Sequence, residues 1–511
     1  MSQRVALLVA LFSFVPCLEA QSTAPYVYQV LPYATVQQSG PYAGTVASKT
    51  NCSNPGCTPG TAALKGTFIA QVPVSSLNSV LTVSVATALS VIPLASPASG
   101  VITKFDPATG AELPASSSLG PIFTERAETI GRHKFYVGLS TEQFHFTSFD
   151  GQSTRAGLKL LDPGGQPTTI TLPSGVSTSP PLTYTMSTDV RVSQNMALLT
   201  FGLTNRFDVS VGLPVVHTAV SAGGYTDTIY AGDGFATGNS HCWCQGTLTP
   251  NIAPATNNLN SLLLPQINFN ALGKTGFGDM LLRFKGTVME RPQMALALGA
   301  DLRLPTGDDR NLLGTGTTEV KPFAALSFYT RPWSNGIVFS PHVNIGWQFA
   351  GQSILAGQIV PTTKSVRATL NGTTYPLTTV YAPPFTATQA YLPDVFSWAV
   401  GSEVALGKRN TVILDVLGNQ IGWIHGIPNM ATLSVRNALP PVQPNQPLAK
   451  SETISGFVSA SRMSFGQYSG AFGYKGRIVG NLVGTANVLV RFDNNGLVAR
   501  AVPLFGLSYT F

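Results

Sequence analysis

Apolar and polar residues alternate with a period of two along most of the chain. In the closing stretch LVARAVPLFGLSYTF (497–511), Phe505, Tyr509 and Phe511 share one face, and the other face carries small, polar or mixed residues. Such a period is typical of a β-strand whose two faces meet different surroundings. The last residues of a soluble domain usually fray into water. An apolar strand that ends on Phe511 therefore indicates a different environment on its apolar side.

Twelve stretches of this kind, separated by turns, follow one another along the chain. They lie at 132–147, 193–204, 208–217, 276–288, 293–304, 317–329, 336–350, 394–407, 411–419, 466–476, 482–492 and 497–511. The last two are joined by Asp493-Asn494-Asn495-Gly496, in which Asn-Gly is a strong hairpin signal. Short connections alternate with long ones, and the long ones lie at about 148–190, 218–275, 305–316, 351–393 and 420–465.

This alternation of short and long connections predicts the fold class, because outer-membrane barrels have short periplasmic turns and long extracellular loops. We expect an all-β protein, a transmembrane antiparallel up-and-down β-barrel of about 12 strands. The expected range is 12–14, since two more strands could lie within 60–130 or 420–465. An even number of strands places both ends of the barrel segment on the periplasmic side.

The charged residues of the predicted strands fall opposite the apolar face. In GFGDMLLRFKGTV (276–288), Asp279, Arg283 and Lys285 share one face, while Leu282 lies on the other. A Lys or Arg that faces lipid at mid-bilayer costs about 2–4 kcal/mol, so several of them together would rival the stability of a whole domain. The charged face is therefore predicted to line a wet lumen, or a lumen in which charges pair.

The candidate lumen-lining residues share this polar face of their strands. They are Asp279, Arg283, Lys285, Asp301, Arg303, Glu319, Lys321, His342, Glu403, Asp415, Lys475, Arg491 and Arg500. The alternative is a secreted soluble β protein, in which the apolar face would turn inward instead.

Composition favours a membrane protein without membrane-spanning helices. Of the 511 residues, 10% are charged, against about 25% in soluble domains. Beyond the N-terminus no run of about 20 apolar residues occurs, and a spanning helix needs one. The chain opens with Arg4, an apolar core from Val5 to Val15 and a small-residue cleavage site that ends at Ala20. We read 1–20 as a secretory signal peptide, with a short buried helix as the alternative, and expect the outer membrane of a Gram-negative-type bacterium as the location.

Removal of the signal peptide leaves Cys52, Cys57, Cys242 and Cys244. An even number of cysteines in an exported chain favours disulfides. The close pairs CSNPGC and CWC could each close locally or cross-link two loops. His241 beside CWC offers a metal site as the alternative, but a zinc site normally needs four ligands at recognisable spacings. We therefore expect disulfides and no metal.

The segment before the barrel shows no clear period. Residues 21–59 are rich in Pro, Ser, Thr and Gly, and the one apolar stretch, SSLNSVLTVSVATALSVIPLAS (75–96), could form a short helix or strands. We expect three parts in the chain: the signal peptide at 1–20, an irregular, plug-like segment at 21–130 that sits partly inside or below the barrel, and the barrel at 131–511.

No motif predicts catalysis or a cofactor. The GKT at 273–275 lacks the upstream Gly of a phosphate-binding loop, because residue 268 is Asn. GDDRN and DNNG do not match the ligand spacing of a calcium loop, and no Ser/His/Asp set stands out. The net charge of +7 is spread without a basic block, so no nucleic-acid partner is implied. We predict a protein that is not an enzyme and carries no cofactor.

Several of these stretches resemble a known family. They are FGLTNRFDVSVGLPVV (201–216), GFGDMLLRFKGTV (276–288), LRLPTGDDRNLLGTGTTEVKPFAAL (302–326) and NVLVRFDNNGLVARAVPLFGLSYTF (487–511). They resemble the bacterial outer-membrane transporter family described as "MetA-pathway of phenol degradation", and 131–151 is similar to the opening strand of such proteins. The resemblance covers about 130–511. It implies a β-barrel channel for small aromatic or other hydrophobic compounds, and transfers no binding residues.

The predicted function is the passive passage of small molecules across the outer membrane, with lumen charges setting selectivity. A barrel of this size is narrower than a porin, so a plug or side chains would constrict it. The alternative is a closed structural or surface-display barrel whose extracellular loops bind a partner. The expected partners are outer-membrane lipid, small-molecule solutes and the barrel-assembly machinery, which would read Phe511. The sequence leaves the oligomeric state open.

Overall fold

The computed structural model describes part of the chain together with its side chains. These residues are 26–28, 82–93, 118–156, 187–221, 272–330, 337–357, 387–407, 409–422 and 464–511, and further helix and strand segments are described by their backbone alone. The signal peptide 1–20 and the side chains of Cys52, Cys57, Cys242 and Cys244 lie outside the described residues, so the expectations about cleavage and disulfides remain predictions.

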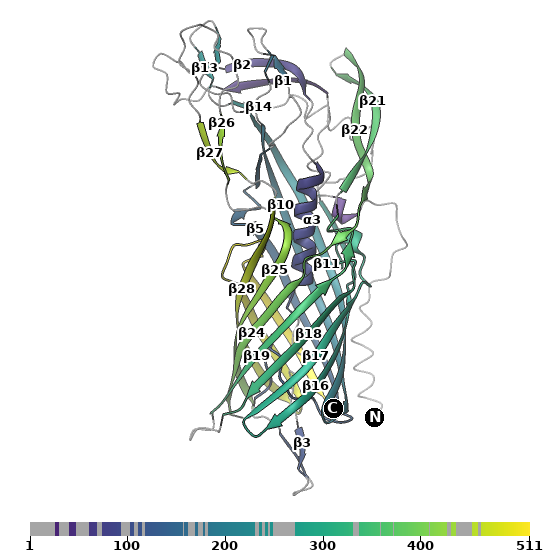
Figure 1. Cartoon of the computed structure of the whole chain (residues 1–511), viewed down its shortest axis with the longest axis vertical. Coiled ribbons are helices and arrows are strands. Elements are labelled where there is room, and N and C mark those ends of the chain that lie inside the picture. The colour runs from purple at the N-terminus through teal and green to yellow at the C-terminus, as the bar shows by residue number, and fades with distance from the viewer. Residues whose placement is uncertain are drawn as a thin grey trace.

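Twelve antiparallel strands of the described chain close into one barrel (Figure 1). They are β5 (Phe135–Phe149), β10 (Leu182–Thr204), β11 (Phe207–Ile229), β16 (Met280–Arg291) with its short forerunner β15 (Ala271–Phe277), β17 (Met294–Leu304), β18 (Glu319–Phe328), β19 (Ile337–Ala350), β24 (Val395–Leu406), β25 (Asn410–Gly426), β28 (Ser461–Val479), β29 (Leu482–Arg491), and β30 (Leu497–Ala499) continued by β31 (Ala501–Thr510). The last strand pairs with β5 and closes the sheet. The prediction of an all-β barrel of about twelve strands is confirmed.

The connections alternate in length as predicted, except for the last one, where only the turn around 492–496 separates β29 from β30. Tight turns join the strands at the lower end in Figure 1, for example where Thr204 pairs with Phe207 and Arg291 with Met294. Both ends of the barrel segment meet at this end, because the amide of Phe511 donates to the carbonyl of Phe135 over 2.8 Å.

Strands β10, β11, β25 and β28 run well past their predicted limits and rise above the rest of the barrel (Figure 1). The extra residues of β10, such as LTYTMSTDV at 182–190, are rich in Thr and Ser and lack the apolar alternation. The alternation marks contact with lipid rather than the strand itself, so it stops where the strand leaves the bilayer.

Shorter elements lie outside the barrel wall or inside it. They are η1 (Val27–Gln29), β1 (Gly40–Ala47), β2 (Thr61–Phe68), α3 (Val74–Ser90), β3 (Thr103–Asp106), β4 (Ala111–Pro114), β6 (Gln152–Ser153), β7 (Leu158–Leu161), β8 (Thr169–Thr171), β9 (Ser177–Thr178), β12 (Phe235–Thr237), β13 (His241–Trp243), β14 (Gly246–Leu248), η2 (Asp309–Asn311), β20 (Gln352–Ser353), β21 (Ile359–Leu370), β22 (Thr373–Ala387), β23 (Ala390–Tyr391), β26 (Ala431–Val435) and β27 (Glu452–Phe457). Among the described residues, no helix combines the length and the hydropathy needed to cross a bilayer.

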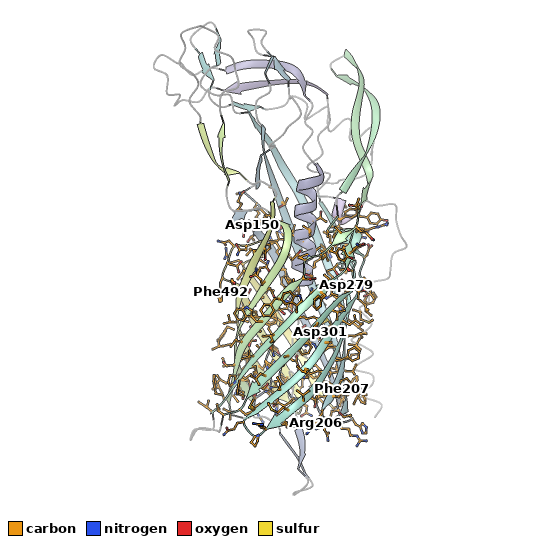
Figure 2. All side chains as sticks on the ribbon, in the orientation of Figure 1. Asp150, Arg206, Phe207, Asp279, Asp301 and Phe492 are labelled. Atoms are coloured by element: carbon orange, nitrogen blue, oxygen red, sulfur yellow. The ribbon has the colours of Figure 1, made fainter. Side chains whose placement is uncertain are left out.

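The outer face of the barrel is apolar. Leu298, Leu414, Phe472 and Phe505 are each more than half exposed there. Aromatic side chains mark both edges of the apolar band: Phe207 lies near the lower turns and Phe492 in the upper half (Figure 2). Apolar bands with aromatic edges are the outer surface of outer-membrane barrels. The protein is therefore an outer-membrane barrel, and the alternative of a soluble β protein with its apolar face inward is wrong.

Candidate functional site in the barrel interior

The barrel interior is occupied by two parts of the chain that precedes it. Helix α3 descends into the upper half of the barrel (Figure 1), where Val85, Ala86 and Leu89 are buried. The apolar stretch that could have been a helix or strands is thus a helix. Its residues Ala, Leu, Val and Ser are apolar or small on every side, as a helix surrounded by protein requires.

The second part is the extended segment 118–130, which crosses the interior and contains no regular secondary structure. Its backbone amides are satisfied by carboxylates of the wall. The amide of Gly120 donates to Glu403, that of Phe123 to Asp415 and that of Ile130 to Asp208, over 2.8–3.1 Å. A buried amide without a partner costs free energy, so these inward carboxylates do for the segment what a neighbouring strand would otherwise do.

Arg126 is the most deeply buried charge of this segment, at 1% exposure. Its guanidinium donates to both carboxylate oxygens of Glu403, at 2.9 Å from Nε and 2.5 Å from Nη2. His342 places Nε2 2.8 Å from the same carboxylate. Glu403 is completely buried. Its negative charge is compensated by Arg126 of the segment and faced by His342 of the wall.

Glu125 forms a second charge cluster beside the first. Its carboxylate accepts from Arg283 over 2.9 Å and from Lys285 over 2.7 Å. Arg283 also donates to both oxygens of Asp301, over 2.6 and 2.7 Å. Lys285 reaches the backbone carbonyls of Arg126 and Glu128. Strand β16 is thereby fastened to the internal segment through charge-assisted hydrogen bonds, which are stronger than neutral ones, and Arg283 links it to Asp301 of β17.

The other candidate lumen-lining residues lie at four kinds of place. Asp415 and Lys475 bind the segment directly, the latter through the carbonyl of Pro121. Arg303 reaches the carbonyl of Leu89 at the end of α3 and lies 3.5 Å from Glu319. Asp279 instead accepts from the amides of Gly307 and Thr315 and so holds a loop. Lys321 lines a cavity that is described below.

Arg491 and Arg500 lie at the hairpin between β29 and β30, not beside the internal segment. Arg491 donates to Asp493 over 2.9 Å. Arg500 is exposed in the break between β30 and β31 and reaches Asn494. They brace the turn that the sequence identified by its Asn-Gly step.

Two sets of interior residues were missed by the sequence analysis. Thr124-Glu125-Arg126-Ala127-Glu128 carries three charges within five residues of an otherwise weakly charged segment, and that density was the available signal. Asp208 stood at the start of the predicted strand 208–217 and was not among the lumen-lining candidates, although it lies one residue inside β11 and is buried at 2% exposure.

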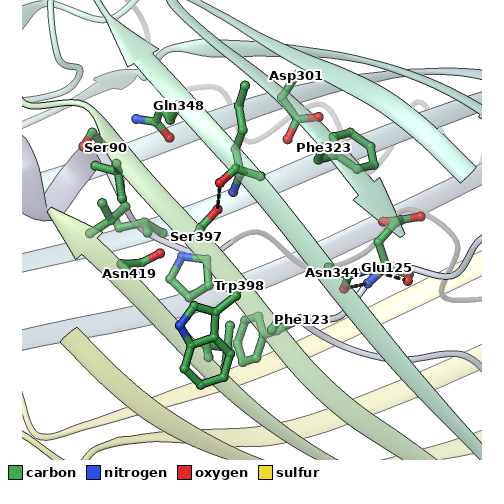
Figure 3. Close-up of a pocket in the computed structure, with 18 of the residues that line it drawn as sticks. Ser90, Phe123, Glu125, Asp301, Phe323, Asn344, Gln348, Ser397, Trp398 and Asn419 are labelled. Atoms are coloured by element: carbon green, nitrogen blue, oxygen red, sulfur yellow. Dashed lines mark hydrogen bonds between the residues drawn. The ribbon is translucent and has the colours of Figure 1, made fainter. Parts of the chain in front are cut away.

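A cavity of about 140 Å³ lies between the end of α3, the internal segment and the wall (Figure 3). Its apolar lining includes Ile92, Phe123, Phe323 and Leu417. The polar side chains of the lining are Glu125, Arg283, Asp301, Arg303, Glu319, Lys321, Asn344, Gln348, Ser397 and Asn419. A smaller cavity of about 60 Å³ shares Ile92, Leu417 and Asn419 with it. The space around the helix end is therefore roomy enough for a small molecule and contains both apolar and charged groups.

Within the side chains that the structure describes, no group of three or more His, Cys, Asp or Glu residues is arranged to hold a metal ion.

The chain is similar to several solved structures. An outer membrane channel from Pseudomonas putida F1 is 10% identical, with a TM-score of 0.37, over 75% of this chain and 98% of that one. A Pseudomonas aeruginosa FadL homologue is 10% identical, with a TM-score of 0.27, over 82% and 98%. The Ralstonia pickettii toluene transporter TbuX is 9% identical, with a TM-score of 0.27, over 75% and 90%.

No curated protein sequence matches the chain. A family model does match, over residues 173–401, which form the barrel wall from β10 to β24 together with the loops between these strands. This confirms the resemblance seen in the sequence: the matched part of the chain has the pattern of the family described as "Putative MetA-pathway of phenol degradation".

Proposed function

We propose that this protein is an outer-membrane channel for the passive passage of small molecules, with aromatic and other hydrophobic compounds as its solutes. The observation that carries the proposal is the closed barrel whose interior holds a mixed apolar and charged cavity. The family match, whose description names phenol degradation, supports aromatic solutes. Solved channels of similar architecture include one described as a toluene transporter. The proposal includes no catalytic step.

We propose further that 21–130 acts as a plug for the barrel formed by 131–511. The support is the contact of 118–130 with inward carboxylates of several strands and the entry of α3 from the opposite end. Since these groups are compensated pairwise, the barrel charges serve chiefly to fasten the segment. A free ring of charges would instead act on ions in transit.

The alternative remains a closed barrel whose extracellular loops bind a partner. The observation in its favour is the same charge network, because a segment held at so many points blocks the lumen. A channel lets small solutes cross the membrane, whereas a closed barrel does not.

Solute flux separates them. The purified full chain is reconstituted into planar bilayers and into liposomes for swelling assays with sugars and with small phenolic acids. A channel with a filled lumen gives small ionic conductance and admits phenolic acids faster than sugars of equal mass. Absence of both conductance and uptake, with the protein shown to be inserted, contradicts the channel and favours the closed barrel.

The C-terminal residue offers a separate proposal about assembly. Phe511 is half exposed on the outer face, and its ring lies 4.7 Å from that of Tyr509 and 6.2 Å from that of Phe135. We propose that the barrel-assembly machinery reads this terminal aromatic strand. Deleting Phe511 should reduce the amount of inserted barrel in cells, while refolding of the purified chain into detergent changes little. Equal insertion of both chains would contradict the proposal.

A further inference from the structure

The cavity beside the end of α3 has an unequal distribution of charge. Its three acidic lining residues are each engaged. Glu125 accepts from Arg283 and Lys285, both oxygens of Asp301 accept from Arg283, and Glu319 accepts from Gln348 and lies 3.5 Å from Arg303. The nearby Asp279 is satisfied by backbone amides of the 305–316 loop. No carboxylate of this group retains both oxygens for a further cation.

Lys321 is the exception among the cations of the cavity. Within the side chains that the structure describes, its ammonium makes no hydrogen bond and no ion pair, although it lines the cavity. Asp301 lies directly across the ladder from Lys321, but both of its oxygens are taken by Arg283. An ammonium removed from bulk water gains most from an anionic partner. The cavity therefore offers a cation to whatever enters it.

The position of Lys321 is fixed by a glycine of the next strand. A Cβ at Gly346 would lie only 2.8 Å from Cε of Lys321, so the lysine side chain lies over the space that the glycine leaves. The register places Gly346 opposite Ser397, and Ser397 opposite Asn419. Asn419 also lines the cavity, and its side chain makes no hydrogen bond within the part of the chain that the structure describes. The ammonium and this amide therefore lie along one row of the wall.

The apolar part of the lining contains three aromatic rings, Phe123 of the internal segment and Phe323 and Trp398 of the wall. The guanidinium of Arg283 lies 5.2 Å from the centre of the Phe323 ring and helps to hold it. The ring of Trp398, which also lines the cavity (Figure 3), packs at Gly418 and beside Tyr468. The volume of about 140 Å³ is close to that of cavities of about 150 Å³ that hold one benzene ring.

We propose that this cavity is a binding site for a small aromatic carboxylate, with the ring between apolar walls and the carboxylate on Lys321. This inference rests on the proposed channel function, since the site would be one binding site on the path of the solute through the barrel. It narrows the solute class from aromatic compounds in general to aromatic anions, because a neutral hydrocarbon would leave the ammonium of Lys321 without a partner.

Calorimetric titration of the full chain in detergent tests the site with three probes. Benzoate has both ring and charge, benzamide has the ring without the charge, and acetate has the charge without the ring. Benzoate should bind at least tenfold more tightly than either of the others, a factor that corresponds to about 1.4 kcal/mol.

Lys321→Met is the decisive variant, because it removes the charge and keeps an unbranched apolar stem. It should lower benzoate affinity about tenfold or more and leave benzamide binding unchanged. Lys274→Met is the matched control: it removes the same charge from β15, outside the cavity lining, and should change neither. Circular dichroism confirms that each variant retains the barrel.

Two results would overturn the inference. One is equal affinity of the wild-type chain for benzoate and benzamide, or no binding of either. The other is benzoate affinity that is unaffected by Lys321→Met. Either result can occur while phenolic acids still cross reconstituted membranes, so failure of this site is distinguishable from failure of the channel function, which would appear as absent flux.

Discussion

Replacing Glu403 with glutamine should lower the free energy of unfolding of the barrel by about 3–5 kcal/mol, the usual cost of leaving a buried charge without its partner. The charge left behind is that of Arg126, whose guanidinium is 1% exposed and donates to both oxygens of the Glu403 carboxylate. His342 loses its neighbouring carboxylate as well. The measurement is urea unfolding of the refolded chain in detergent micelles.

A matched pair elsewhere in the barrel provides the control. Asp189 accepts from Arg191 at 3.3 Å from Nε and 2.8 Å from Nη2 and also lies near His145 and Arg155, but Arg191 and Arg155 are each 58% exposed. Because exposed pairs contribute only about 0–1 kcal/mol, Asp189→Asn should change the free energy of unfolding little. Adding Arg126→Met to Glu403→Gln should restore part of the loss, since no unpaired charge then remains. If both single variants lose the same amount, burial does not decide the strength of the pair.

Removing residues 21–130, so that Ala20 is followed directly by Gly131, should change the protein from a constricted barrel into an open ion channel. Both interior parts of the chain, α3 and segment 118–130, are lost in this variant. The inward charges that they compensated become hydrated by the water that replaces them. Single-channel recordings in planar bilayers should therefore show large, long-lived conductance steps that the full chain lacks.

A shorter deletion separates the plug from the rest of the N-terminal segment. Removal of 21–73 ends just before α3 and leaves 118–130 in the chain, so conductance should stay at the level of the full chain. If the long deletion inserts as a barrel but conducts no better than the full chain, the interior is closed by something other than 21–130. The division of the chain at residue 131 would then lose its functional meaning.

Much of the barrel could be predicted from the sequence, because lipid imposes a rule on every strand that it touches. Leu298 and Leu302 alternate with Gly299 and Asp301 in β17, and the structure has the same alternation between outside and inside. The rule needs no knowledge of neighbouring strands. It could therefore fix strand number and sidedness from local pattern alone, and it failed only where strands such as β10 leave the bilayer.

The arrangement of the interior could not be predicted in the same way. Which carboxylate meets which amide depends on contacts between residues far apart in the chain. Lys475 and Pro121, for example, are separated by 354 positions. The sequence placed Glu403 and Asp415 on an inward face, but it gave no partner for either. A polar inward face is compatible both with the wall of an open pore and with a wall that binds a segment of the chain.

The internal segment draws its ligands from across the circumference of the barrel. Asp208 comes from β11, Ser327 from β18, Glu403 from β24 and Asp415 from β25. Apart from β24 and β25, which pair directly, these strands are not adjacent, and they surround one interior only when the cylinder closes, although the segment itself is synthesised first. Seating of 118–130 is consequently a late event in biogenesis, and a wall with one strand misaligned would lack a ligand at the matching point. The internal segment thus stabilises the correctly closed barrel relative to barrels with a strand in the wrong register.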